Sequence, residues 1–221
     1  MRLSRFTNIV GECNFPNANG HGRYLSQLER RGTVHLLLDP AVERFALALP
    51  KIYYTLGDGR RRRYTGDTLV EFHHCAGRRP LVIEYKYSNE FIRKPGLLEY
   101  YEKIREVLDR ADYDFEIRTE KHVLTRSFRA KEFVCGYLND DNSVFDNEVI
   151  RIVAQRGQVR LQDLLMHMRS DAHEQLKIVP AVWRLVARKK IHIGYDSLPS
   201  RETMIYAFPV NQNRKSEDDR I

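Results

Sequence analysis

Three charged residues with a defined spacing lie at the ends of two neighbouring strand-like segments. Asp67 precedes one segment, and Glu84 and Lys86 follow an apolar stretch in the run 81–86. Because side chains alternate along a strand, Glu84 and Lys86 share one face and Tyr85 points to the other. A charge on a buried strand is costly unless it is paired or bound to a metal. The pattern therefore indicates either a reactive site or an internal ion pair.

The chemistry that fits these residue types is metal-assisted hydrolysis of a phosphodiester. Asp67 and Glu84 would hold one or two Mg²⁺ ions through oxygen, with the backbone carbonyl of Tyr85 as a further ligand and Mn²⁺ as a substitute metal. A bound metal lowers the pKa of its water. Lys86 would then orient or activate that water, or neutralise the phosphate charge. The spacing alone leaves open a plain cross-strand ion pair between Lys86 and Asp67.

The surrounding elements that must position these residues alternate between helix and strand. Residues 57–59 predict a hairpin turn, and Asp39-Pro40 predicts a helix end. In order, the pattern predicts a helix over 22–38, strands over 42–47, 52–56, 64–72 and 81–87, a helix over 96–110 and a strand over 113–118. This order predicts an α/β fold in which helices pack on a mixed sheet.

A polar cluster at residues 139–143 marks a change of pattern and predicts a linker. Three short helices and a hairpin follow, which is the winged-helix order, and basic residues including Arg184 and Arg188 lie on or beside the third helix. That helix would enter a DNA groove, although winged helices also bind proteins and such charges also form solvated faces. We expect domains at 1–140 and 141–210, with a disordered tail at 211–221.

Composition predicts a soluble cytoplasmic protein with a basic surface. The 221 residues include 37 Lys and Arg against 30 Asp and Glu, for a formal net charge of +7, which favours polyanionic partners. The chain has no stretch of about 20 apolar residues, so we expect no membrane span. The arginine run 60–63 lies near the predicted site, where it would grip a DNA backbone or form a solvated turn.

Five short motifs in one order make residues 24–125 resemble the TnsA family, the endonuclease subunit of heteromeric cut-and-paste transposases. The motifs lie at residues 25–30, 38–45, 63–70, 82–86 and 115–121. The resemblance implies a restriction-endonuclease-like PD-(D/E)xK core followed by a small winged-helix domain. The compact C-terminal part is compatible with the CRISPR-associated branch of these transposons.

The resemblance also implies roles for individual residues. Asp67 and Glu84 take the metal-ligand positions, Lys86 takes the lysine position, and Glu29 takes the helix glutamate that completes the site, whereas spacing alone favours an exposed helix charge for Glu29. Gly66 stands where a proline is usual. No catalytic position is lost.

The function implied is Mg²⁺-dependent hydrolysis of the 5′ strands at transposon ends, in the bacterial cytoplasm. A TnsB-like transposase would process the 3′ ends, and a TnsC-like ATPase regulator would contact the C-terminal domain. Two alternatives stay open: a free-standing restriction- or repair-type nuclease of the same fold, and a non-catalytic DNA-binding adaptor.

Overall fold

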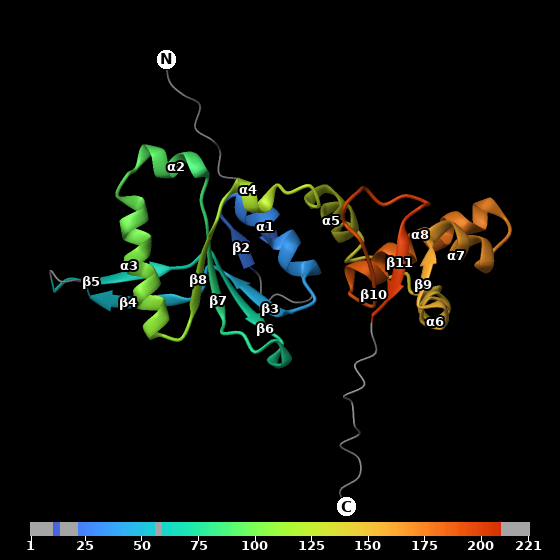
Figure 1. Cartoon of the computed structure of the whole chain (residues 1–221), viewed down its shortest axis with the longest axis horizontal. Coiled ribbons are helices and arrows are strands. Elements are labelled where there is room, and N and C mark those ends of the chain that lie inside the picture. The colour runs from blue at the N-terminus through green and yellow to red at the C-terminus, as the bar shows by residue number, and fades with distance from the viewer. Residues whose placement is uncertain (1–10, 14–21, 56–58, 209–221) are drawn as a thin grey trace, which may run out of the picture. The chain divides into compact units, whose positions relative to one another are not determined.

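A computed structural model describes residues 11–13, 22–55 and 59–208 (Figure 1). The chain divides into two compact units, Met1–Lys131 and Glu132–Ile221, so the predicted linker at 139–143 lies within the second unit. The predicted tail at 211–221 lies outside the described residues. None of the described helices has the length and apolar composition needed to cross a membrane.

The first unit is an α/β structure built on a mixed four-stranded sheet. Its elements are β1 (Gly11–Cys13), β2 (Gly22–Tyr24), α1 (Gln27–Leu38), β3 (Val42–Leu47), β4 (Lys51–Thr55), β5 (Arg61–Thr65), β6 (Thr68–Phe72), the 3₁₀ helix η1 (His74–Ala76), β7 (Leu81–Tyr85), α2 (Ser88–Arg93), α3 (Leu97–Arg110), β8 (Asp114–Arg118), α4 (Glu120–Val123) and α5 (Phe128–Cys135), which crosses into the second unit. The sheet order is β3-β6-β7-β8; β7 and β8 are parallel, and the other neighbours are antiparallel.

Helices cover both faces of this sheet (Figure 1), and as a result every residue of β7 is buried. On one face, α1 packs so closely that a Cβ on Gly32 would lie 2.3 Å from the Tyr85 ring. On the other face, Val82 of β7 packs in a cluster with Tyr101, Ile104 and Leu108 of α3. A strand covered on both sides is expected to be continuously apolar. The buried Glu84 is therefore an exception that calls for an explanation.

Three of the predicted elements differ from the structure by two residues or more. The predicted strand 81–87 ends at Tyr85, so Lys86 lies just past β7. The first helix begins at Gln27 rather than at residue 22, because Ser26 is its N-cap and accepts a hydrogen bond from the Glu29 amide. The predicted strand 64–72 is two strands, β5 and β6, in different sheets. The break lies at Gly66, where a Cβ would meet Val82 Cγ1 at 2.6 Å and where the amide donates to the Pro50 carbonyl. Proline would lose that bond and clash, which explains the glycine at this position.

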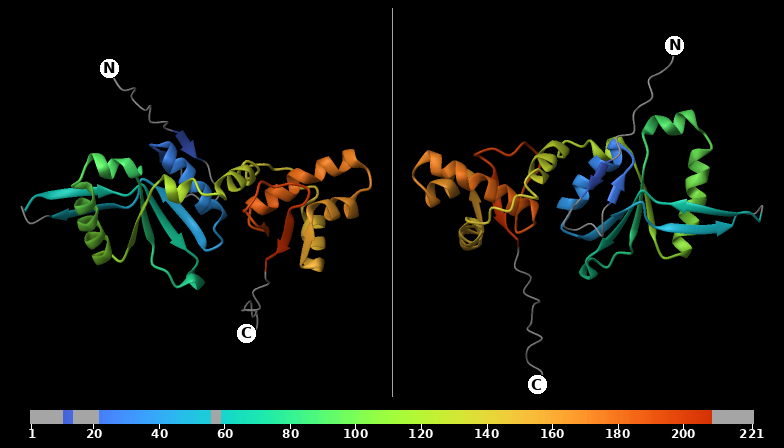
Figure 2. Two further views of the ribbon diagram at one scale, coloured as in Figure 1. Left: turned by 45° about the horizontal axis from the view of Figure 1, so that its top comes forward. Right: turned by 180° about the vertical axis from the view of Figure 1, so that it is seen from behind.

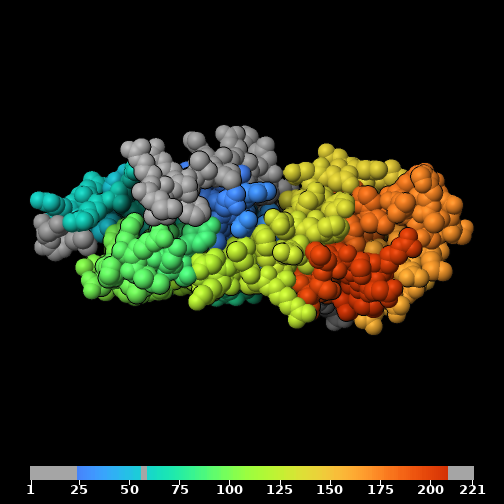
Figure 3. Space-filling model, turned by 90° about the horizontal axis from the view of Figure 1, so that it is seen from above, coloured from blue at the N-terminus to red at the C-terminus, as the bar shows by residue number. Residues whose placement is uncertain are grey.

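The strands β4 and β5 form a separate antiparallel hairpin, as the sequence predicted. Figure 2 shows this hairpin crossing α3 and extending beyond it. In the space-filling view, the teal hairpin and the green α2–α3 segment adjoin (Figure 3). The inner residues Tyr54 and Tyr64 join the α3 cluster, so the hairpin is anchored by apolar burial.

The second unit contains helices and a three-stranded antiparallel sheet of order β10-β11-β9. Its elements are α6 (Asp146–Arg156), β9 (Gln158–Arg160), α7 (Leu161–Met168), α8 (Ala172–Ala187), β10 (Ile191–Ile193) and β11 (Met204–Ala207). The three helices and the β10–β11 pairing follow the prediction, and β9 was not predicted. Its three residues are too few to show an alternating pattern.

Candidate active site

The Glu84 carboxylate is held inside the first unit by two tyrosine hydroxyls and by the Lys86 ammonium. Glu84 is 6% exposed. Its Oε2 accepts from the Tyr64 hydroxyl at 2.6 Å, and its Oε1 accepts from the Tyr101 hydroxyl at 2.8 Å. Burial, together with the Glu84 charge, raises the pKa of both tyrosines, so the phenols stay protonated and donate. The carboxylate is thus fixed in one orientation.

Lys86 provides the cation of the site. Its ammonium lies 2.9 Å from Glu84 Oε1 and 3.2 Å from the Tyr85 carbonyl oxygen. Burial by itself would lower the pKa of Lys86, but the charges of Glu84 and Asp67 outweigh it and raise the pKa overall. Lys86 is therefore an ammonium ion whose ion pair is with Glu84, rather than with Asp67 as the alternative prediction had it.

Asp67 joins the start of β6 to the end of β7. Its Oδ2 accepts from the Tyr85 amide at 2.7 Å. Burial and the nearby Glu84 charge raise the pKa of Asp67 to about 7, against the opposing influence of Lys86. At neutral pH this carboxyl is therefore only partly ionised. The site has more negative charge than Lys86 alone can balance.

Glu29 approaches the same cluster from α1. It is 7% exposed, so the interpretation of an exposed helix charge is wrong. Its Oε2 accepts from the Leu25 amide at 2.8 Å, beside the Ser26 cap of the same helix. Its charge contributes to the raised pKa of Asp67, which places it within electrostatic range of that carboxyl.

The oxygen groups of this site are of the type that hard divalent cations prefer. Mg²⁺ prefers oxygen ligands, commonly takes only one or two protein carboxylates, and keeps several waters. Glu84 Oε1 and the Tyr85 carbonyl already converge on one cation, the Lys86 ammonium. Within the described ranges, no group of three or more His, Cys, Asp or Glu side chains is arranged to hold a metal. The oxygen groups present are the carboxylates of Asp67 and Glu84 and the Tyr85 carbonyl, which would be the ligands of a bound metal together with water.

Sequence reasoning missed the two tyrosines that orient Glu84. Neither residue is assigned a role at the site from sequence, because Tyr64 and Tyr101 lie at inward positions of β5 and α3, where aromatic residues usually belong to the core. A signal was nevertheless present, since a buried phenol requires a hydrogen-bond acceptor. The one buried carboxylate predicted on the facing strand is that acceptor.

The basic residues of α8 do not form an open positive face. Arg184 is fully buried and forms ion pairs with Asp146 and, at 3.3 Å, with Asp140. Arg188 donates to the Asp140 carbonyl oxygen at 2.9 Å, and Lys177 pairs with a carboxylate one turn away on the same helix. The prediction of a basic helix face is therefore corrected for Arg184 and Arg188, which bind residues 138–140 and the start of α6 to the C-terminal part of α8.

No family model matches the chain, and no curated protein matches it.

Proposed function

We propose that this chain is a Mg²⁺-dependent DNA endonuclease with a PD-(D/E)xK core. The observation that supports it is the cluster at the ends of β6 and β7, where the carboxyls of Asp67, Glu84 and Glu29 gather near the Lys86 ammonium. A carboxyl whose pKa is raised to about 7 by burial and by the nearby Glu84 charge is a group that a divalent cation would ionise fully. The mixed sheet with α1 and α3 on its two faces is compatible with that core.

In this proposal each residue has a distinct task. Asp67 and Glu84 bind the metal, and Tyr64 and Tyr101 keep Glu84 oriented toward it. The metal, when bound, supplies a water of lowered pKa and neutralises phosphate charge. Lys86, as an ammonium ion, donates hydrogen bonds to the attacking water or to the phosphate oxygens.

The resemblance to TnsA extends the proposal to a biological setting. The chain would cut the 5′ strands at transposon ends in bacterial cytoplasm, together with a TnsB-like transposase and a TnsC-like ATPase. The order helix, strand, helix, helix and hairpin after Asp146 supports a winged-helix domain. Because α8 uses Arg184 and Arg188 internally, we favour a protein partner over DNA for this helix.

The test is strand-specific cleavage of an end-labelled transposon-end duplex by the chain with its transposase partner. Asp67→Asn and Lys86→Ala are each expected to lower 5′-strand cleavage at least a thousandfold, because the first removes a ligand of the metal and the second removes a cation that stabilises the phosphate charge. Lys103→Ala, an exposed lysine on α3, is the matched control and should cut normally.

The outcome also separates the alternatives. Undiminished cleavage by Asp67→Asn would overturn the site assignment. Cleavage by the chain alone, without the transposase, would favour the free-standing nuclease, and wild-type protein without metal affinity or cleavage would favour the adaptor.

A further inference from the structure

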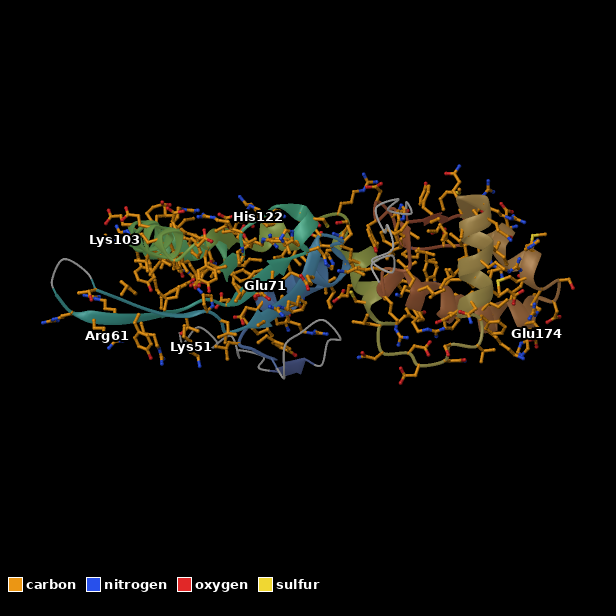
Figure 4. The ribbon with its side chains drawn as sticks, turned by 90° about the horizontal axis from the view of Figure 1, so that it is seen from below. Lys51, Arg61, Glu71, Lys103, His122 and Glu174 are labelled. Carbon is orange, nitrogen blue, oxygen red and sulfur yellow. The ribbon has the colours of Figure 1, made fainter. Side chains whose placement is uncertain are left out.

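The β4–β5 hairpin has two faces of opposite character. Its register pairs Ile52 with Tyr64 and Tyr54 with Arg62, and Tyr54 and Tyr64 are buried against α3. Since side chains alternate along both strands, the opposite face presents an exposed set. That set includes Lys51, Tyr53, Arg61 and Arg63. Figure 4 shows Lys51 and Arg61 on the side of the hairpin away from Lys103 of α3.

This outer face concentrates positive charge around one exposed aromatic ring. Tyr53 is 58% exposed, and the Arg61 guanidinium lies over its ring at 4.7 Å from the centroid. In the part of the chain that the structure describes, no carboxylate pairs with Lys51, Arg61 or Arg63. The segment 51–65 contains five basic residues and one acidic residue. These side chains differ from those of α8, whose arginines are neutralised internally.

The hairpin is connected directly to the candidate active site. Its strand β5 ends at Thr65, two residues before Asp67, and its Tyr64 donates to Glu84. At about 3.3 Å per residue, Arg63 and Arg61 lie roughly 7 and 13 Å along the strand from Thr65. In duplex DNA this corresponds to about two to four nucleotides along one strand.

We infer that the outer face of the β4–β5 hairpin is a DNA-binding arm that holds the duplex beside the scissile phosphodiester. Lys51, Arg61 and Arg63 contact phosphates, and Tyr53 packs on an adjacent sugar or base. The inference rests on the proposed function, because the DNA is the substrate of that site. Duplex DNA fits better than an acidic protein because the exposed ring between the arginines suits a nucleoside, whereas carboxylates would use the cations alone.

The test measures binding of a fluorescent 30-base-pair duplex by anisotropy in EDTA, across a series of salt concentrations. The triple variant Lys51→Gln, Arg61→Gln, Arg63→Gln is expected to bind at least tenfold more weakly. In a plot of log affinity against log salt concentration, the slope of this variant should be less steep than that of wild type by about 2.7, which is 0.9 for each of three phosphate contacts. Tyr53→Leu should weaken binding about fivefold with an unchanged salt slope.

The matched control removes three charges elsewhere on the first unit, by Lys103→Gln, Lys121→Gln and Arg126→Gln, and should keep both affinity and slope. Three results would overturn the proposal that the hairpin is a DNA-binding arm. The first is equal binding by the two triple variants, and the second is a wild-type protein without measurable duplex binding at low salt. The third is displacement of the duplex by polyglutamate at equal charge. Asp67→Asn should bind the duplex normally while failing to cut it. The nuclease assignment and the arm therefore fail in different experiments.

Discussion

Two buried charges, one in each unit, are balanced in opposite ways. In the second unit, the Arg184 guanidinium is fully buried and forms ion pairs with Asp140 and Asp146, so the opposing charges are already present in the fold. In the first unit, Lys86 pairs with Glu84, and Asp67 has no carboxylate-to-cation pair of its own among the ion pairs of the described residues; burial and the Glu84 charge raise the pKa of Asp67 to about 7.

The difference distinguishes a structural charge from a reactive one. Removing one partner of a closed ion pair leaves a buried charge unpaired and destabilises the fold. A cluster with excess negative charge is itself destabilising and is relieved by a proton or a metal ion. Strongly shifted pKa values of this kind are concentrated at functional sites. The following predictions test this contrast, in order of decreasing expected effect.

The largest effect on stability is expected in the second unit. Arg184→Met should lower the free energy of unfolding by about 3 kcal/mol, because Asp140 and Asp146 lose their shared partner. Urea denaturation followed by circular dichroism measures it. Arg151→Met, on the exposed side of α6, is the control. A variant at Arg184 as stable as this control would contradict the structural role.

Asp67→Asn should change the free energy of unfolding in the opposite direction, by raising it. The folded-state pKa of Asp67 is about 7 and its ordinary value is 3.8, so the folded protein binds the extra proton between these values. Stability from this group is therefore present at low pH and lost as the pH rises through about 7. In EDTA at pH 8, Asp67→Asn should raise the free energy of unfolding on the order of 1 kcal/mol, with no gain near pH 4. Destabilisation at pH 8 would contradict the excess of negative charge.

The tyrosines that orient Glu84 should have an intermediate effect on metal affinity. Tyr64→Phe and Tyr101→Phe each remove one hydrogen bond to the carboxylate and should weaken Mn²⁺ binding about tenfold, as is typical of groups that orient ligands. Tyr54→Phe, in the same aromatic cluster, should leave the affinity unchanged. Equal affinities for all three variants would show that Glu84 needs no such support.

The smallest effect is expected at Glu29. Glu29→Gln keeps an acceptor for the Leu25 amide but removes a charge that raises the pKa of Asp67. Mn²⁺ affinity in the absence of DNA should fall only twofold to fivefold, because Glu29 attracts the metal ion electrostatically without binding it directly. A loss of a hundredfold would instead make Glu29 a direct metal ligand.

The sequence predicted those parts of the fold that depend on local pattern. The strand Val42–Leu47 and the helix Leu97–Arg110 match the predicted ranges to within one residue, because their apolar periods are regular. The break at Gly66 was missed, since it depends on close contacts with Val82 and the Leu49 carbonyl, residues distant in sequence. The proximity of Asp67, Glu84 and Lys86 was predicted from strand ends alone.

What could not be predicted was how each charge is balanced. Arg184 and the exposed arginines of β5 look alike in sequence, yet one is buried by tertiary packing and the others are on an outward face. The hydrogen bonds from Tyr64 and Tyr101 to Glu84 join residues 20 and 17 positions apart, and no local pattern encodes them. Burial and pairing arise only when distant elements pack.

The central claim, that the Asp67–Glu84 cluster is a divalent-metal site, is tested most directly by calorimetric titration of Mn²⁺ into wild-type protein, Asp67→Asn, Glu84→Gln and the Lys103→Gln control. The titrations are run at pH 6 and pH 8, with and without a DNA duplex. We predict binding by wild type and control, at least tenfold weaker binding in both site variants, and tighter binding at pH 8 because a proton competes for Asp67 below its pKa of about 7. Wild-type protein that binds no metal even with DNA, or site variants that bind as tightly as wild type, would contradict the account.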